Sequence, residues 1–567
     1  MKVLFLHCDY FRFKPLKKAL KSVENLSERD KGGGESKDCL AVLVAVEKTD
    51  KNISEIVSEL IENVNDISKQ INTNKIVLYP YAHLSKNLAA PEIAQKVLNE
   101  SEKNLEKIYS VLKAPFGYYK EFEMKVKGHP LSELSREIIV GGKEDSEGYA
   151  PEQLLKEISK SKLDSSKLKE NDHRIIGKQM DLFSFNETAP GMVFWHNNGL
   201  IVYNKLINFW REIHKKQGYE EIKTPEILDK RLWQISGHWE KYKENIFLTS
   251  YEKRDFAVKP MNCPGGILIF KNKPKSYKEL PLKVGELGIV HRMELSGTLG
   301  GLFRVVQFTQ DDAHIYCTEK QMADELEKIV NLADFFYKKF ELELDHIELS
   351  TRPEKRIGKD KIWDLAEKTL GNVLKKVGVK YKINKGDGAF YGPKIDFHIK
   401  DSLGRTWQCG TIQLDFSMPE RFELEYTDND NKKKRPVMIH RTVYGSLERF
   451  IGILLENTKG RFPIWLAPEQ VRVLSFTDRN KVFAKKITDK LKKEIPYLRI
   501  NSDFDSTTIP SKVKEAELMK VPYIIVLGDR EEKEDNLAIR IKGDKKIHKF
   551  SFEEFKDKIK KEIEEKR

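Results

Sequence analysis

The chain has 567 residues, of which 39% are hydrophobic and 33% are charged, and its formal net charge is +13. This length exceeds one hydrophobic core, so we expect three or four domains, and the basic excess favours a polyanionic partner such as a nucleic acid. Five cysteines without tight spacing argue against a disulfide framework, and no stretch reaches the roughly 20 apolar residues of a membrane span, so we expect a cytoplasmic protein.

Residues 1–140 alternate short apolar strands with amphipathic helices. We expect strands at "VLFLH", "CLAVLVAV" and "KIVLYPYAH". A helix is predicted after Pro91, because apolar residues recur there near helical spacing, at Ile93, Val97, Leu105, Ile108 and Leu112. The segment "KGGGESKD" at 31–38 is typical of a surface loop. Residues 141–172 are polar and poor in core positions, which predicts a linker.

The block 173–465 is expected to hold an antiparallel or mixed sheet with added helices. It opens with a helix that Gly218 is well placed to end, and whose apolar stripe is Tyr203, Leu206, Ile207, Trp210 and Ile213. In 466–567, "VRVLSF", "YLRINS" and "YIIVLG" alternate with helices at about 480–495 and 509–520. This order predicts a βαβαβ domain with a mostly parallel sheet, followed by a solvated terminal helix at "KDKIKKEIEEKR".

The stretch "RVVQFTQDDAH" at 304–314 ends an apolar run with two carboxylates and a histidine. Side chains alternate between the two faces of a strand, so one face would carry Arg304, Val306, Phe308, Gln310, Asp312 and His314. By itself this pattern also fits the solvated face of an antiparallel strand.

Other chemically active residues lie far from this strand in the sequence. Arg292 and Glu294, in "HRMELSGTLGGLFR", are predicted to end the preceding strand of a hairpin. Arg449 lies just inside the apolar helix "VYGSLERFIGILLE", Cys263 lies in "KPMNCPGG", and His440 closes "RPVMIH". Taken singly, these three also fit a surface arginine, a small core residue and a core histidine.

The order of these segments resembles that of class II aminoacyl-tRNA synthetases. "HRMELSG…FRVVQFTQ" is similar to their motif 2, "GSLERF" to motif 3, and "GYEEIKTPEI", with Pro225, to motif 1. With "MNCPGG", "DDAHIYC", "DGAFYGPKIDFHI" and "WQCGTIQLDF", the chain from Asp172 onward resembles the threonyl-tRNA synthetases. The resemblance implies an α/β and α+β multidomain protein with a class II antiparallel catalytic core, a homodimer, and ATP, L-threonine and tRNA(Thr) as partners.

The same resemblance implies a nucleotide site whose residues bind phosphate and adenine. Planar guanidiniums suit phosphate because they donate two hydrogen bonds in a fixed geometry. Arg292 would contact the α-phosphate, Phe308 would stack on adenine, and Glu294 would face its amino edge. The resemblance implies that Mg²⁺ accompanies ATP and that the three arginines are catalytic. The implied ATP-binding residues are Arg292, Glu294, Arg304, Phe308, Gln408 and Arg449.

The resemblance also implies a zinc ion beside the threonine pocket. Its ligands would be Cys263, His314 and His440, whose spacing fits no finger pattern. Asp312 would pair with the substrate's ammonium group, and the pocket would be completed by Gln310, Tyr391 and Gln413. Because strand alternation does not place Gln408 and Gln413 on one face, we predict a β-bulge at Gly410.

Residues 1–140 resemble the archaeal-type editing domain, which is related to D-aminoacyl-tRNA deacylases. The similar segments are "KIVLYPYAHLS" and "PFGYYKEFEMKVKGHPLSELSR". A pocket that accepts threonine rejects serine by only about 10–200-fold, so hydrolysis of seryl-tRNA(Thr) at a second site is expected. The resemblance implies that the editing pocket is lined by His83, Tyr119, Lys120 and Glu133. The sequence alone also fits a simple loop histidine at His83 and an exposed strand lysine at Lys120.

The block 466–567 resembles the anticodon-binding domain of several class II synthetases. Glu531, in "LGDREE", and Arg540, in "LAIRI", occupy positions where the family reads anticodon bases. The expected function is a threonine–tRNA ligase with editing. Two alternatives remain: another class II member, such as a prolyl or seryl enzyme, or an RNA-binding relative without catalysis. The presence together of Arg292, Arg304 and Phe308 with Arg449 argues against the latter.

Overall fold

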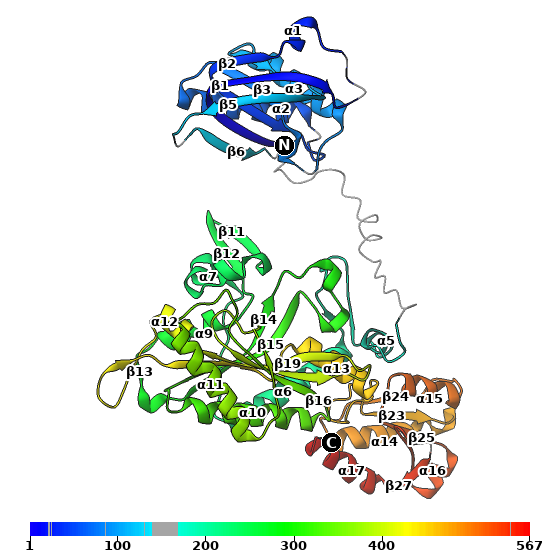
Figure 1. Ribbon diagram of the computed structural model, residues 1–567. Coiled ribbons are helices and arrows are strands. Elements are labelled where there is room, and N and C mark those ends of the chain that lie inside the picture. Colours follow the sequence, from blue (N-terminus) through cyan, green and yellow to red (C-terminus); the bar gives the residue numbers. More distant parts are fainter. Residues whose placement is uncertain are drawn as a thin grey trace. The chain divides into compact units, whose positions relative to one another are not determined.

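The computed structural model describes residues 1–138 and 168–566, apart from Lys21, Ser22, Glu24, Lys51, Lys86, Pro130 and Lys545. The chain divides into two compact units, Met1–Pro151 and Glu152–Arg567 (Figure 1). Most of the predicted linker at 141–172 lies outside the described residues. The domain boundaries at 140, 172 and 465 therefore stay predictions.

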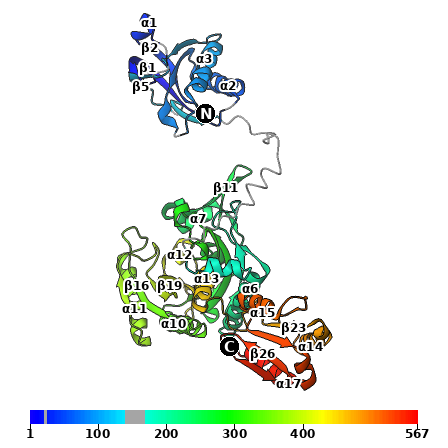
Figure 2. The ribbon, with the colours of Figure 1, turned by 90° about the vertical axis from the view of Figure 1, so that its right-hand side faces the viewer.

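The first unit is a six-stranded sheet with helices on one face. Strands β4-β3-β2-β1-β5 are neighbours in that order, and β6 also pairs with the long, shared strand β1. Helices α2 and α3 cover one face (Figure 2), where Val64 and Val97 pack with Val42 of β2. The elements are β1 (Lys2–Lys18), α1 (Glu28–Lys31), β2 (Gly34–Ala45), α2 (Ile53–Ile71), β3 (Lys75–Pro80), α3 (Pro91–Leu105), β4 (Ser110–Lys113), β5 (Tyr118–Val126) and β6 (Glu133–Glu137).

Two predictions for this unit are wrong at their boundaries. Helix α3 ends at Leu105, so Ile108 lies beyond it, and Leu112 belongs to β4, which pairs in parallel with β3. Apolar residues of the strand continued the helical spacing by chance. The segment 31–38 is a loop only in part, since β2 begins at Gly34 and pairs with β1 there. Pairing along a hairpin outweighs the low strand propensity of its residues.

The second unit is built on an eight-stranded sheet with the order β17-β16-β18-β19-β22-β15-β14-β9. All neighbouring pairs are antiparallel except β9 with β14 and β17 with β16, so the predicted mixed sheet is confirmed. Its strands are β9 (Glu220–Glu221), β14 (Leu282–His291), β15 (Gln307–Cys317), β16 (Leu344–Ser350), β17 (Lys382–Asn384), β18 (Lys394–Lys400), β19 (Thr406–Asp415) and β22 (Val437–Thr442).

Long helices pack against this sheet and form its main core. Helix α6 buries Leu206 and Trp210 of its predicted stripe, while Tyr203, Ile207 and Ile213 are partly buried against the same core. Gly218, with φ +76°, follows its end. The left-handed backbone there favours glycine. The helices are α5 (His173–Gln179), α6 (Asn197–Lys216), α7 (Lys230–Ser236), α8 (His238–Lys241), α9 (Cys263–Lys271), α10 (Met322–Lys339), α11 (Asp360–Val377), α12 (Ser417–Arg421) and α13 (Leu447–Thr458).

Short strands complete this part of the unit in small sheets of two or three members. They are β7 (Phe183–Ser184), β8 (Phe194–Trp195), β10 (Ile227–Asp229), β11 (Leu248–Tyr251), β12 (Arg254–Val258), β13 (Lys275–Ser276), β20 (Tyr426–Thr427) and β21 (Lys433–Lys434). Strand β10 pairs with β12, which leads the chain toward Cys263 at the start of α9.

The last part of the chain has the predicted strand–helix alternation. Its sheet order is β24-β23-β25-β26-β27, with β23 parallel to β24 and β25 but β26 and β27 antiparallel, so "mostly parallel" holds only for its first half. The elements are β23 (Val471–Ser475), α14 (Lys481–Glu494), β24 (Ile500–Asp503), α15 (Ile509–Leu518), β25 (Tyr523–Leu527), α16 (Asp529–Glu534), β26 (Leu537–Ile541), β27 (Ile547–Phe550) and α17 (Phe552–Glu564).

The terminal helix α17 is more than a solvated tail. Phe555 and Ile559 on its inner face are fully buried in the core of this domain. A high lysine and glutamate content hid this amphipathic pattern, because long charged side chains occupy the outer face. Among the helices that the structure describes, none combines the length and the apolar character needed to cross a bilayer.

Candidate active site

The hairpin of β14 and β15 carries the residues that the sequence singled out. On β15, Phe308, Gln310 and Asp312 point into one cavity, as the alternation predicts. The arginines lie outside the regular strands: β14 ends at His291, so Arg292 follows it, and Arg304 precedes β15. Backbone pairing continues past the strand end, because Arg292 N–H donates to the Val306 carbonyl at 2.9 Å.

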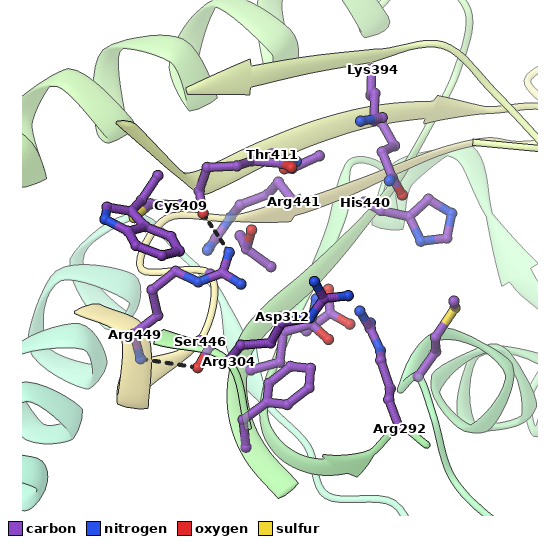
Figure 3. Close-up of a pocket in the computed structure, with 18 of the residues that line it drawn as sticks. Arg292, Arg304, Asp312, Lys394, Cys409, Thr411, His440, Arg441, Ser446 and Arg449 are labelled. Atoms are coloured by element: carbon purple, nitrogen blue, oxygen red, sulfur yellow. Dashed lines mark hydrogen bonds between the residues drawn. The ribbon is translucent and has the colours of Figure 1, made fainter. Parts of the chain in front are cut away.

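One cavity gathers almost all of the residues predicted for the core (Figure 3). They come from the β14–β15 hairpin, from β19 and β22, from the segment just before β18, and from the start of α9 and α13. The lining includes Cys263, Arg292, Glu294, Arg304, Phe308, Gln310, Asp312, Tyr391, Gln408, Gln413, His440 and Arg449. His314 is fully buried behind this wall.

Among the residues that the structure describes, four arginines line the cavity, and the three that were predicted, Arg292, Arg304 and Arg449, are held from different sides. Arg304 forms an ion pair with Glu294 (Nη2–Oε2 2.8 Å), and the Arg292 guanidinium lies 5.1 Å from the centre of the Phe308 ring. Arg449 donates from Nε to the Phe303 carbonyl (2.9 Å) and from Nη1 to the Gln408 carbonyl (2.8 Å). Burial lowers the pKa of Arg449 from its ordinary value. With Arg441 and Lys394, which also line the cavity, these cations suit a polyanion such as a triphosphate.

The predicted bulge in β19 is present. In the pairing with β18, Gln408 faces His398 and Thr411 faces Asp396, so the two residues 409–410 oppose only one residue of β18. Gln408 Nε2 donates to Thr411 Oγ1 at 2.9 Å, which places both side chains on the cavity side. The extra residue therefore brings Gln408 and Gln413 to the same face.

A row of polar residues crosses the sheet at the inner end of the cavity. In the register of the sheet, His314 of β15 is opposite His440 of β22. His440 is in turn opposite Gln413 of β19, and Gln413 is opposite Lys394 of β18. Gln413 Oε1 accepts from the Tyr391 hydroxyl at 2.5 Å. Antiparallel pairing thus assembles a compact polar pocket from segments far apart in the sequence.

Asp312 is a buried carboxylate at the entrance to this pocket. Burial raises its pKa to about 7, the nearby His440 opposes the rise, and Glu286, its cross-strand neighbour, adds to it. Asn262 Nδ2 lies 3.4 Å from its Oδ2. Such a carboxylate is stabilised in its ionised form by a cationic or donor ligand.

Cys263, His314 and His440 form a cluster whose possible ligand atoms all lie within 4.8 Å of one another. Within the described residues, neither ring nitrogen of the buried His314 has a hydrogen-bond partner. His440 Nε2 lies 2.8 Å from the Asp415 carboxylate, an arrangement that orients metal-binding histidines. One thiol and two imidazoles suit zinc and leave one coordination position open, so these residues fit the metal that the resemblance implies.

A second cavity lies in the first unit. His83, Tyr119 and Lys120 line it together with Tyr79 and Phe122. Glu133 does not: it is an exposed residue of β6, paired in register with Leu6.

Lys120 is the one charged side chain among those named for this cavity. Its Nζ donates to the carbonyls of Pro115 (2.9 Å) and Tyr118 (3.0 Å) and lies 5.1 Å from the centre of the Tyr79 ring. Burial lowers its pKa to about 8.

Three family models match successive parts of the chain. Residues 1–138 match the "Archaea-specific editing domain of threonyl-tRNA synthetase", residues 245–458 the "tRNA synthetase class II core domain (G, H, P, S and T)", and residues 470–562 an "Anticodon binding domain". The chain is 38% identical, with a TM-score of 0.66, to a solved structure described as the RNA binding domain of threonyl-tRNA synthetase from Cryptosporidium parvum. The match covers 69% of this chain and 98% of that one.

The chain belongs to the threonyl-tRNA synthetase family. It is also similar to a putative threonyl-tRNA synthetase from Aeropyrum pernix, with 29% identity, a TM-score of 0.61, and coverage of 70% of this chain and 96% of that one. A curated threonine–tRNA ligase from Clostridium tetani is 54% identical over 396 residues, which are 70% of this chain and 62% of the relative. The chain thus spans less than two thirds of the length of the curated relatives it matches.

The other carboxylate of "QDDAH", Asp311, has a structural role in this chain. Asp311, on the other face of β15, accepts from the backbone N–H groups of Val443 (3.0 Å) and Gly445 (2.8 Å). Glu448 of α13 accepts from Thr309 N–H at 3.0 Å. This face of the strand holds the loop and helix that carry Arg449, a role that sequence reasoning missed although alternation had separated the two faces.

Two further cavity residues of this synthetase-family chain were also missed. Lys394 is paired with Asp396 (2.6 Å) and Asp387 (2.9 Å), and Trp407 stacks on Phe303 with ring centres 4.4 Å apart. Both lie within quoted segments, Lys394 in "DGAFYGPKIDFHI" and Trp407 in "WQCGTIQLDF". Their pairing across the sheet, which the sequence does not state, is what brings them to the cavity.

The two anticodon predictions are not tested by this geometry. Glu531 Oε2 accepts from Gly528 N–H at 2.9 Å and thereby caps the start of α16. Arg540 lies on β26, and its Nε has no hydrogen-bond partner among the described residues. Both assignments stay predictions.

Proposed function

We propose that this chain is a threonine–tRNA ligase that also hydrolyses mischarged seryl-tRNA(Thr). The observation that carries the proposal is a single cavity with three guanidiniums at one end and Asp312 beside a Cys–His–His cluster at the other. One end suits a nucleotide triphosphate, and the other suits a small molecule with an amino and a hydroxyl group. ATP–pyrophosphate exchange tests the activation step without tRNA.

Activation joins the threonine carboxylate to the α-phosphorus of ATP. The new carboxylate–phosphorus bond forms as the bond from the α-phosphorus to the bridging oxygen breaks, and pyrophosphate leaves with that oxygen and its electron pair. Arg292 would stabilise charge on the α-phosphate, while Arg304 and Arg449 hold the phosphate tail and the adenine. Positioning and charge stabilisation suffice, without a covalent enzyme intermediate. Mg²⁺ bound to the nucleotide would supply further charge neutralisation.

Threonine selection would depend on the inner end of the cavity. Cys263, His314 and His440 would hold a zinc ion, which when bound supplies Lewis-acid binding of the substrate's amino and hydroxyl groups. Asp312 accepts a hydrogen bond from the amino group, and Tyr391 with Gln413 closes the pocket around the side chain. Valine lacks the hydroxyl and is rejected, because the polar pocket would be left unsatisfied.

Serine satisfies the same polar groups and differs by one methyl, which is worth only about 1–3 kcal/mol. The cavity of the first unit is therefore proposed to hydrolyse seryl-tRNA(Thr), with water attacking the ester carbonyl and the ribose hydroxyl leaving. Lys120 has donors on two carbonyls, and its charge would stabilise the developing oxyanion or orient the water.

Replacing Lys120 by methionine is expected to lower deacylation of seryl-tRNA(Thr) by about 10²-fold, the usual effect of losing one transition-state donor. If the cation acts, the wild-type rate falls as pH rises through about 8, because the ammonium loses its proton there. Deacylation of preformed seryl-tRNA measures both effects. Lys125→Met on the exposed side of the same strand is the matched control, and threonine activation should not change in either variant. A pH-independent rate together with full activity of the Lys120→Met variant would contradict the role.

The remaining expectations are proposals of the same kind. We infer a homodimer and a tRNA(Thr) partner from family membership and from the matches to the class II core and anticodon-binding models. Glu531 and Arg540 are proposed to contact the anticodon, and a cytoplasmic location is expected for such an enzyme. A catalytically inactive RNA-binding relative is the second candidate, and it would bind tRNA without exchanging pyrophosphate.

A further inference from the structure

A second cluster of metal-binding side chains lies on β16 and β18, away from Cys263. His346 and His398 face each other across the antiparallel pair, and their rings stack with centres 4.4 Å apart and planes 5° apart. Glu348 is two residues along β16 and shares their face. Its Oε1 lies 3.1 Å from His346 Nε2, and its Oε2 lies 3.5 Å from His398 Nε2. One carboxylate thus faces two imidazole nitrogens.

The hydrogen bonds around His346 define what its Nε2 offers. His346 Nδ1 lies 2.6 Å from the Asp345 carboxylate and its Nε2 lies 3.1 Å from Glu348 Oε1, so each ring nitrogen faces a group that can only accept. The contact between Nε2 and Glu348 needs a cation between the two atoms, either a proton or a metal ion. A metal ion there would take the place of the proton on Nε2, while Nδ1 keeps its proton toward Asp345. The carboxylate–histidine pair also matches the arrangement that orients histidine ligands of metals.

The other two ligands are also prepared for a cation. His398 Nε2 is buried and makes no hydrogen bond within the described residues. Asn384 Nδ2 donates to Glu348 Oε2 at 2.9 Å and holds the carboxylate toward the rings. The three possible ligand atoms lie within 4.8 Å of one another, and the side chains are only partly exposed.

We propose that His346, Glu348 and His398 bind one divalent transition-metal ion, such as Zn²⁺, Co²⁺ or Ni²⁺, at a site separate from Cys263. Two imidazoles and one carboxylate are a donor set that these ions prefer over Mg²⁺ or Ca²⁺. Zinc bonds of about 2.0–2.1 Å place tetrahedral ligands roughly 3.4 Å apart, so binding requires the stacked rings to rotate toward a common point.

The ion would clamp β16 to β18 beside the nucleotide cavity. Glu348 pairs in register with Asp396, whose carboxylate accepts from Gln408 and from Thr411, both in the cavity wall. The site is therefore a brace for the strands behind that wall and contains none of the groups proposed to contact ATP.

A third cluster, Asp172, His173 and Glu456, does not compete for the ion. Its buried histidine uses both nitrogens: Nδ1 lies 2.8 Å from the Glu456 carboxylate, and Nε2 accepts from Leu302 N–H at 3.0 Å. No lone pair remains for a metal. The number of metal ions bound per chain therefore distinguishes the Cys263 site alone from two sites.

Equilibrium dialysis of the full chain against buffered Co²⁺, followed by metal analysis, tests the proposal. We expect two equivalents for the wild type, one for Cys263→Ala/His440→Asn, and one for His398→Asn or Glu348→Gln. The ion kept by the Cys263→Ala/His440→Asn variant should lack a thiolate-to-cobalt charge-transfer band, whereas the ion kept by His398→Asn should show it. Circular dichroism checks folding, and His548→Asn, a surface histidine paired with Asp544, is the control.

Two results would overturn the proposal. One is a Cys263→Ala/His440→Asn variant that is folded and binds no cobalt. The other is a His398→Asn and a Glu348→Gln variant that both bind as many equivalents as the wild type. Because neither measurement uses catalysis, the outcome is independent of the proposed ligase activity.

Discussion

Replacing Arg449 by alanine should lower threonine-dependent ATP–pyrophosphate exchange by about 10²–10³-fold, the usual effect of removing one preorganised donor from a transition state. The side chain is held by the Phe303 and Gln408 carbonyls through Nε and Nη1. Within the part of the chain that the structure describes, its Nη2 makes no side-chain hydrogen bond, and the guanidinium lies at the cavity (Figure 3). Initial exchange rates at saturating threonine, with ATP varied, measure the loss.

A lysine variant separates the geometry of Arg449 from its charge, and a distant arginine supplies the control. Arg449→Lys keeps the positive charge but cannot make the two fixed hydrogen bonds, so it should recover only a small part of the activity. Arg479→Ala removes an exposed arginine that is paired with Asp529 in the last domain, and it should exchange like the wild type. A folded Arg449→Ala protein with wild-type exchange would refute the role of this arginine.

Replacing Asp312 by asparagine should raise the KM for threonine, or lower kcat/KM, by about 10²-fold or more. The variant keeps the shape but removes the charge, and losing one member of a buried charged pair costs about 2–5 kcal/mol. The KM for ATP should change little, because the arginines are untouched. Exchange measured against threonine and ATP separately gives both constants.

The neighbouring residue supplies the control for this experiment. Asp311 faces away from the cavity and accepts from two backbone N–H groups of the loop before α13. Asp311→Asn should therefore lower the melting temperature without a selective rise in the KM for threonine. An Asp312→Asn protein with an unchanged threonine KM would contradict the assignment of Asp312.

Local alternation predicted the inward face of the strand at 304–314, although β15 is regular only over Gln307–Cys317 and Arg304 precedes it. Period-two alternation depends only on local geometry, so it separated Asp312 from Asp311 correctly. The bulge at Gly410 followed from the resemblance, which requires Gln408 and Gln413 on one face, and the pairing of β18 with β19 confirms it. The βαβ alternation of the last domain was also confirmed, because each element there has its own local hydrophobic period.

Long-range pairing could not be obtained from such patterns. His314 and His440 become neighbours only because β15 pairs with β22 in this register, and Cys263 joins them from the start of α9. Resemblance to the family, and no spacing rule, suggested this set. The same limit explains the wrong end of α3, because the partner that claims Leu112 is strand β3. Glu133 was placed in the editing cavity by resemblance alone, and the structure has it on β6, outside the residues that line that cavity.

The second metal cluster was not predicted at all. His346 and His398 are 52 positions apart and only the register of β16 with β18 makes them neighbours. Single histidines between apolar residues look like ordinary sheet positions. Clusters of side chains from different strands are therefore the hardest feature of this chain to predict from sequence, because they depend on strand register.

The central claim, that this chain activates threonine in a metal-dependent pocket, is tested most directly by ATP–pyrophosphate exchange. The assay would compare threonine, serine, valine and proline, each with and without a strong zinc chelator. We predict rapid exchange with threonine, weaker exchange with serine, negligible exchange with valine and proline, and loss of all activity on chelation. Folded protein that exchanges with none of the four, or best with proline, would contradict the claim.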